Sequence, residues 1–188
     1  MPRLTPTTVL IITNILIFAY TSVVGGSFPY TAQVVLIRLG QYNRYVIAHG
    51  WYWQLFTSMF VHADVLHLFL NMIFLLIFGF RAEELFSTEE FFTIYFASGL
   101  FGSFLTLLMP LNTVSAGASG AIFGMFGACV IYIRKMLGGS IIGAFILTFY
   151  FLLLNSASPN INLFAHFGGL VAGLVIGYVL AKTRKIII

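Results

Sequence analysis

The sequence predicts an all-α membrane protein with six transmembrane helices and a long membrane-associated first loop. Hydrophobic residues occupy 60% of the 188 positions and charged residues only 7%, and the mean hydropathy is +1.02. Because a soluble domain carries about 25% charged residues, this chain has too little charge to cover a water-soluble globule. The apolar runs also lack the alternation in ~10-residue segments that a membrane barrel needs, so helices must satisfy the backbone in lipid.

Six segments are candidate spans, since a spanning helix needs about 20 mainly apolar residues. They cover residues 8–24, 62–80, 89–109, 119–134, 139–155 and 162–182. The first segment is long enough to span and follows one arginine and two prolines, which favours a transmembrane helix over a cleavable signal peptide. No soluble domain remains and no internal repeat is evident, so we expect residues 1–188 to form one transmembrane domain without duplicated halves.

The segment 25–61 differs from the other connections because it is long and rich in aromatic residues. These are Phe28, Tyr30, Tyr42, Tyr45, Trp51, Tyr52 and Trp53. Tyr and Trp favour the membrane–water interface, where the ring is in lipid and the polar tip in water. We therefore expect an ordered loop whose short helices lie in one leaflet.

The basic residues predict the orientation of the chain in the membrane. With six spans, most of them fall on one side, namely Arg3, Arg81, Arg134, Lys135, Lys182, Arg184 and Lys185. Only Arg38 and Arg44 fall on the other side, so the positive-inside rule places both termini in the cytoplasm. The expected location is the cell membrane. The net charge of +4 does not indicate a nucleic-acid partner, because the basic residues are scattered at helix ends.

Neither a metal nor another cofactor is expected. The one cysteine, Cys129, lies inside an apolar run and has no partner for a disulfide or a Cys/His metal site. We interpret it as a packing residue.

Polar side chains in three of the predicted spans need an explanation, because an apolar bundle tolerates them poorly. His67 and Asn71 lie one turn apart and share a helix face, and His62 lies near the start of the same segment. Ser119 begins the fourth span and His166 lies near the start of the sixth. Spans two, four and six all begin on the non-cytoplasmic side, so we expect these groups at similar depth in the outer leaflet.

The fourth span is short, because about fifteen residues separate Ser119 from Arg134 and cover about 22 Å of a roughly 30 Å core. Its first turn should therefore lie below the outer surface. Residues 111–118 should descend to it as irregular backbone, which is tolerated only in protein or beside a water-filled cavity. We thus expect Ser119, His67 and His166 to face one wet pocket inside the membrane.

Small residues recur every four positions on two of the spans. They are Ala165, Gly169, Gly173, Gly177 and Ala181 on the sixth, and Gly120, Gly124 and Ala128 on the fourth. Such ridges let helix backbones touch, and packing alone would explain them. Beside Ser119 and His166, they would also hold a nucleophile against a base.

Acyl transfer is the chemistry that these residues favour. A serine becomes nucleophilic when a neighbouring base takes its proton, and His166 is the one histidine in the last three spans. Those spans contain no acidic residue, so we expect a modestly active Ser-His dyad, with Asp64 as the remaining candidate for a third member. The N–H of Ser119 at a helix start, with donors from His67 and Asn71, would stabilise an oxyanion. The alternative is structural, because a single His or Asn inside the membrane serves equally often only to hydrogen-bond one helix to another.

At these residues the sequence resembles the rhomboid family of intramembrane serine proteases. The matching elements are Gly117-Ala118-Ser119-Gly120, the GxSG motif; His62 and His67-x-x-x-Asn71; and Ala165-His166-x-x-Gly169-x-x-x-Gly173. They occur in order and the resemblance covers essentially the whole chain. It implies a six-helix core in which Ser119 is the nucleophile and His166 the general base, with His67, Asn71 and the Ser119 amide as oxyanion hole. It also implies single-span membrane proteins as substrates, cut near the outer end of their helix.

The sequence departs from the family pattern at two positions. Some relatives have Trp-Arg where this chain has Trp53-Gln54, and some have a tyrosine at the position of Phe123. By resemblance Phe123 would stack on the histidine, but it cannot donate a hydrogen bond. Residues 79–83 resemble the cytoplasmic Gly/Glu element of the family, which we interpret as structural.

One rival function is that of a catalytically inactive rhomboid-like protein that binds transmembrane helices. Inactive members lose a catalytic residue or carry proline before the serine, whereas here Ala118 precedes Ser119 and His166 is present, so we expect activity. A proton or solute channel would need acids or several histidines on its path.

By resemblance, the substrate gate is expected at the fifth span and the loop near 155–161. The oligomeric state is left open.

Overall fold

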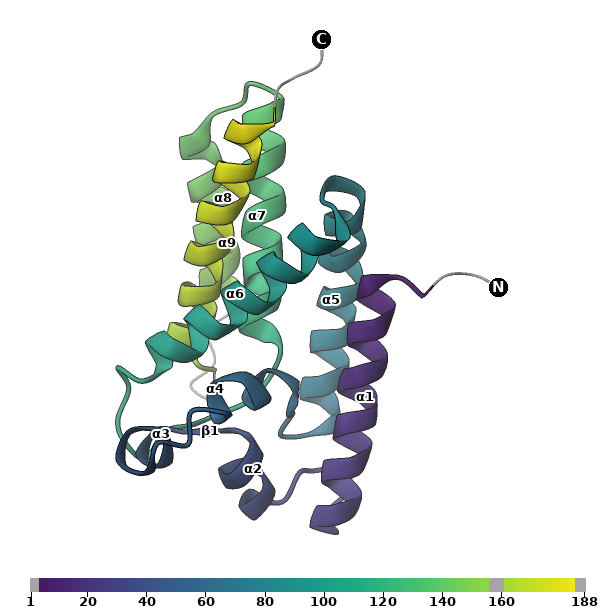
Figure 1. Ribbon diagram of the computed structural model, residues 1–188, viewed down its shortest axis with the longest axis vertical. Coiled ribbons are helices and arrows are strands. Elements are labelled where there is room, and N and C mark those ends of the chain that lie inside the picture. The colour runs from purple at the N-terminus through teal and green to yellow at the C-terminus, as the bar shows by residue number, and fades with distance from the viewer. Residues whose placement is uncertain (1–3, 156–160, 185–188) are drawn as a thin grey trace.

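A computed structural model describes residues 4–155 and 161–184 of this chain, with the backbone alone at 152–155. Within that part the chain forms nine α-helices (Figure 1). The long helices are α1 (Pro6–Gly25), α5 (Val65–Leu85), α6 (Thr88–Thr106), α7 (Ser119–Met136), α8 (Ile141–Asn155) and α9 (Leu163–Thr183). They lie at the six predicted positions, so the all-helical class is confirmed.

Three of the described helices, α1, α5 and α9, are long and apolar enough to cross a membrane. The described part of α8 is a shorter apolar helix. The mean hydropathy of α6 is lowered by Glu89 and Glu90 in its first turn, and that of α7 by Arg134 and Lys135 in its last turn.

The predicted start of the second span, at residue 62, is wrong. Asp64 caps α5, and its carboxylate accepts a hydrogen bond from the backbone N–H of His67 at 2.8 Å. His62 therefore precedes the helix, in extended chain that is joined to the first loop by the hydroxyl of Thr31, which donates to the His62 carbonyl at 2.7 Å. The cap, rather than the apolar run, decides where the helix begins.

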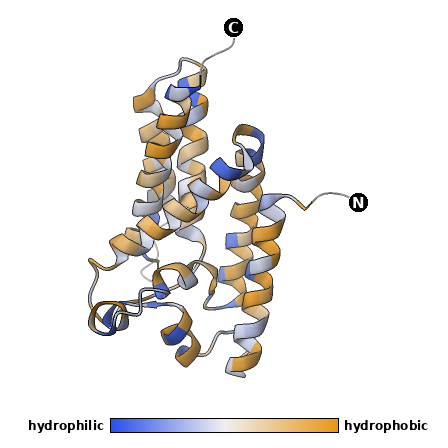
Figure 2. Cartoon of the chain, viewed as in Figure 1, coloured by the Kyte–Doolittle hydropathy of each residue, from blue (hydrophilic) through white to orange (hydrophobic). Residues whose placement is uncertain are grey.

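The helices form a bundle of α6, α7, α8 and α9 beside a pair formed by α1 and α5 (Figure 1). The helix α6 crosses the bundle obliquely, and α5 contacts α7 to join the two parts. Most residues of the long helices are hydrophobic (Figure 2). Many of the exposed large hydrophobic side chains, such as Leu16, Ile77 and Val175, lie on α1, α5 and α9, as expected for helices that face lipid.

The predicted close packing of α7 on α9 is confirmed. A Cβ added at Gly173 would lie 2.6 Å from the Cα of Gly124, and one at Gly169 would lie 3.1 Å from the Cα of Gly120. The two backbones therefore touch where glycines face each other, and any side chain there would push the helices apart.

The first loop is ordered and contains short helices, as predicted. They are α2 (Gln33–Leu39), α3 (Asn43–His49) and α4 (Gln54–Thr57), followed by a 3-10 turn at Ser58–Phe60. The loop also holds a strand that was not predicted: β1 (Gln41–Tyr42) pairs antiparallel with β2 (Val114–Ser115). This pair joins the first loop to the segment that leads into α7.

The side chain of Gln54 connects several parts of the first loop. Its side chain is fully buried, and its Nε2 donates to the carbonyls of Ile37 at 2.8 Å and Arg38 at 3.2 Å. Its Oε1 accepts from the N–H of Tyr42 at 2.9 Å. A neutral amide thus connects α4 to α2 and β1 without burying a charge.

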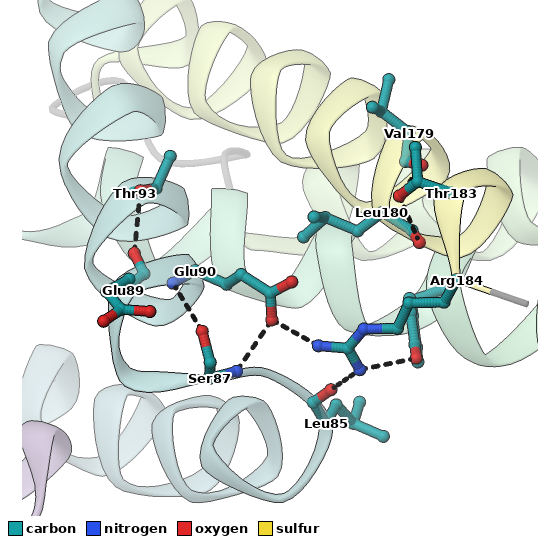
Figure 3. Close-up of polar contacts among 10 residues, drawn as sticks. Leu85, Ser87, Glu89, Glu90, Thr93, Val179, Leu180, Thr183 and Arg184 are labelled. Carbon is teal, nitrogen blue, oxygen red and sulfur yellow. Dashed lines mark hydrogen bonds and ion pairs between the residues drawn. The ribbon is translucent and has the colours of Figure 1, made fainter.

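Arg184, immediately after α9, connects this helix to the junction of α5 and α6 (Figure 3). Its Nη1 donates to the carbonyl of Leu85 and to the hydroxyl of Tyr132, each at 2.8 Å. Its Nη2 pairs with Glu90, whose carboxylate also accepts from the N–H of Ser87 at 2.8 Å in the capping box of α6. One guanidinium therefore ties α9 to α5, α6 and α7.

We expect Arg184→Met to destabilise the protein by about 1–2 kcal/mol, because it removes the hydrogen bonds that a partly exposed, charged guanidinium donates. For a chain of this size that corresponds to a fall in Tm of roughly 2–8 °C, measured by circular dichroism in detergent. Arg81→Met is the matched control, because the Arg81–Glu84 pair is 49% and 63% exposed. A shift no larger than that of the control would contradict the prediction.

Candidate active site

A cavity of about 570 Å³ lies among α5, α6, α7, α8 and the start of α9. Most of the predicted site residues line it, namely His67, Asn71, Gly117, Ser119, Gly120, Phe123 and His166. The structure therefore brings together polar groups from three helices that are far apart in sequence. Ser119, His67 and His166 thus line one cavity, and its location inside a membrane stays a prediction.

Ser119 and His166 are in hydrogen-bond contact. The distance between Ser119 Oγ and His166 Nε2 is 2.8 Å, and His166 is 7% exposed. Ser119 is the first residue of α7, and His166 lies in the first turn of α9. The backbones of these two helices are in contact close by, at Gly120 and Gly169. The arrangement allows the imidazole to take the proton of the hydroxyl.

Phe123 lies one turn after Ser119 and therefore on the same face of α7. Its ring stacks on the imidazole of His166, with centroids 4.4 Å apart and an interplanar angle of 29°. The stacking restricts the plane of the imidazole ring. A phenyl ring offers no hydrogen bond, so this support is by packing alone.

Gly117 is required by the backbone that leads into α7. Its φ is +124°, which L side chains rarely adopt, and an added Cβ would lie 2.8 Å from the Nε2 of His67. The N–H of Gly117 donates to the carbonyl of Ser58 at 2.8 Å. The first glycine of the GxSG motif thus allows the chain to pass His67 and to reach Ser119.

Three hydrogen-bond donors are candidates for an oxyanion hole beside Ser119. The N–H of Ser119 has no intrahelical acceptor because this residue begins α7, and the helix dipole favours negative charge there. Asn71 is 6% exposed, and its amide donates one N–H to the carbonyl of His67 at 2.9 Å, while the amide group carries a second N–H. The His67 ring lines the same cavity.

We expect Asn71→Ala to slow covalent labelling of Ser119 by a fluorophosphonate about 10²-fold, the usual effect of removing one oxyanion donor. The measurement is the labelling rate in detergent. Asn14→Ala is the matched control, because the Asn14 amide also donates to the carbonyl four residues earlier, at 2.8 Å, but lies on α1 away from the cavity. Equal labelling rates for the two variants would remove Asn71 from the oxyanion hole.

Three predicted residues do not line the cavity: His62, Gly169 and Gly173. The two glycines act through the packing of α9 on α7. His62 is fully buried, and its ring meets that of His67 edge-on at a centroid distance of 5.2 Å. Both ring nitrogens of His62 are buried. Its contact supports the orientation of His67.

Asp64, which the sequence left open as a third catalytic member, has a capping role in the structure. One carboxylate oxygen accepts from the N–H of His67, at the start of α5, and the backbone of Asp64 bridges to Tyr30 in the first loop. Its carboxylate is thus committed to helix capping.

The predicted gate lies partly beyond what the structure describes, because residues 156–160 are outside the described residues. On α8, Phe151 lies against Phe123 and Phe126, with ring centroids 5.5 Å and 4.4 Å apart. An aromatic cluster therefore connects α8 to the ring that stacks on His166. The gate itself stays a prediction.

Asn162 is a residue of the cavity that was not predicted. The sequence indicates it only as the start of the sixth span, although Asn just before an apolar run is an N-cap signal. In the structure its Oδ1 accepts from the N–H of Ala165 at 3.0 Å, which caps α9. Its side chain also lines the cavity.

Comparison with known proteins gives a family for the chain. Residues 49–183 match the family described as "Rhomboid domain". The chain is 36% identical over 140 residues to "RHOMBOID-like protein 6, mitochondrial" of Arabidopsis thaliana, covering 68% of this chain and 43% of that protein. It is 31% identical over 144 residues to "Putative rhomboid protease YdcA" of Bacillus subtilis (strain 168), covering 74% and 72%.

A third relative is "Rhomboid protease GluP" of Bacillus subtilis (strain 168). The identity is 34% over 168 residues, which cover 85% of this chain and 32% of that protein. The chain thus spans less than half the length of two of these three relatives.

Proposed function

Since this chain belongs to the rhomboid family, we propose that it is an intramembrane serine endopeptidase. Its substrates are single-span membrane proteins, which it cleaves within or near their transmembrane segment. The observation that supports this most is the 2.8 Å contact between Ser119 Oγ and His166 Nε2 beside a cavity of about 570 Å³. Further support comes from relatives whose names are "Putative rhomboid protease YdcA" and "Rhomboid protease GluP".

In the proposed mechanism, His166 takes the proton of the Ser119 hydroxyl while Oγ attacks the scissile carbonyl carbon. The Ser119 N–H stabilises the developing oxyanion, with further donors from His67 and Asn71. His166 then gives the proton to the leaving amine, the C–N bond breaks, and an acyl ester remains on Ser119. Water, deprotonated by His166, hydrolyses this ester and restores the dyad. No step requires a cofactor or metal.

We also propose that the six long helices all span the bilayer as a single domain of residues 1–188. The lengths of α1, α5 and α9 and their apolar surfaces support this arrangement. The protein would lie in the plasma membrane, and both of its termini would be in the cytoplasm. Two of the basic residues behind this orientation, Arg3 and Lys185, are outside the described residues.

The test of the proposed function is peptide-bond cleavage in proteoliposomes. The wild-type protein is reconstituted with a panel of single-span reporters whose helices carry small or helix-breaking residues near the outer end. Mass spectrometry of the products should locate a cut within or near the transmembrane segment, and the Ser119→Ala variant should give none. Folded wild-type protein that binds reporters without cutting any would instead support the inactive, helix-binding alternative.

A further inference from the structure

Asn162 joins the two segments that carry the proposed dyad. Its Nδ2 donates to the Ser115 hydroxyl and to the Thr106 hydroxyl, each at 2.8 Å. Its Oδ1 accepts from the N–H of Ala165 at 3.0 Å. The amide thus uses its acceptor and both of its donors, and it bonds α9, β2 and α6 at the same time.

The bond between Asn162 and Ser115 and the contact between His166 and Ser119 join the same two chain segments, four residues apart on each. Ser115 precedes Ser119 by four residues, and Asn162 precedes His166 by four. The backbone N–H of His166 donates to the carbonyl of Asn162 at 3.2 Å, so the two residues share one turn. A displacement of the start of α9 relative to β2 would therefore lengthen both contacts.

Thr106, the partner of Asn162 on α6, is itself held in place by hydrogen bonds. Thr106 is fully buried, and its hydroxyl donates to the carbonyl of Gly102 at 3.0 Å while accepting from Asn162. The carbonyl of Thr106 accepts from the Nδ2 of Asn43 at 2.8 Å. The position of Asn162 is thus tied, through Thr106, to α6 and to the first loop.

We propose that Asn162 is a positioning residue that holds β2 and the start of α9 in the arrangement that brings Ser119 Oγ to His166 Nε2. This inference rests on the proposed function. Helix capping alone would be satisfied by Ser, Thr or Asp. Bonding Ser115 and Thr106 while capping α9 requires one acceptor and two donors in a single uncharged group, which asparagine has.

The test separates capping from positioning with the variant Asn162→Ser, which keeps an N-cap and loses the bonds to Ser115 and Thr106. The rate of fluorophosphonate labelling of Ser119 is measured against reagent concentration with the full-length protein in detergent. We expect the maximal rate to fall at least about 30-fold, while the half-saturating concentration stays within about twofold and Tm falls by no more than the roughly 2–8 °C expected of Arg184→Met. Ser87→Asn exchanges one capping residue for another at α6, outside the cavity, and is the matched control.

Ser115→Ala should lower the maximal rate in the same way, and the double variant should be no slower than the slower single one, because both remove the same contact. Additive effects, or labelling of Asn162→Ser at the wild-type rate, would overturn the positioning role and leave the proposed function standing. A rate loss that merely follows a loss of thermal stability would overturn it too. Folded wild-type protein that does not label at Ser119 would overturn the proposed function, and this role with it.

Discussion

Ser119→Ala is expected to abolish covalent labelling by a fluorophosphonate, and His166→Ala to slow it by at least about 10³-fold. The reagent attaches to an activated serine oxygen, which the first variant lacks. In the second, no imidazole lies 2.8 Å from the hydroxyl to take its proton. The site of labelling in wild-type protein is located by mass spectrometry, which requires no knowledge of the natural substrate.

Two control variants separate this effect from a general disturbance of the bundle. Ser98→Ala removes a fully buried hydroxyl from α6, and His49→Ala removes an exposed imidazole from α3 in the first loop. Both should label at Ser119 at close to the wild-type rate. Labelling that survives in His166→Ala at the control rate would show that the histidine is not the base.

Gly173→Ala is expected to lower Tm by roughly 6–12 °C, which corresponds to about 3 kcal/mol. The added Cβ would lie 2.6 Å from the Cα of Gly124. A flexible side chain could rotate to relieve such a clash, but the backbone of a helix cannot. The helices α7 and α9 must therefore separate, which moves His166 away from Ser119. The labelling rate should fall together with Tm, which is measured by circular dichroism in detergent.

The control for this substitution is Gly143→Ala on α8. A Cβ at Gly143 would meet its nearest neighbour, the Cβ of Ser140, at 3.6 Å, which is ordinary contact. Alanine also favours helix more than glycine does, so Tm should stay level or rise slightly. Gly173→Ala with a Tm as high as that of the control would show that the glycine ridge does not hold the two helices together.

The long helices could be predicted from sequence because each depends on the residues of one continuous chain segment. An apolar run of spanning length has one stable form in lipid, and the runs at 8–24 and 162–182 lie within a few residues of α1 and α9. The helix ends were predicted less accurately, because a single capping contact decides them. At α5 this contact is the hydrogen bond that the carboxylate of Asp64 accepts from the N–H of His67.

The candidate site could be predicted in part, because polar residues are rare in an apolar chain. Ser119 and His166 stood out for that reason, and their similar expected depth in the membrane indicated a shared pocket. The role of Asn162 could not be predicted, since its partner Ser115 is 47 positions away and no periodicity relates the two. The role of Gln54 depends in the same way on backbone carbonyls of α2, which it reaches only after the first loop has folded.

By itself, the sequence determined the class of the protein, the number and approximate position of its long helices, and the residue types that allow acyl transfer. These follow from composition and from spacing along one chain segment. The tertiary structure alone decided the 2.8 Å contact of Ser119 with His166, the stacking of Phe123, and the bonds of Asn162 to Ser115 and Thr106. The physical reason is that these distances depend on how closely α6, α7 and α9 approach one another, and glycines on all three helices allow that close approach.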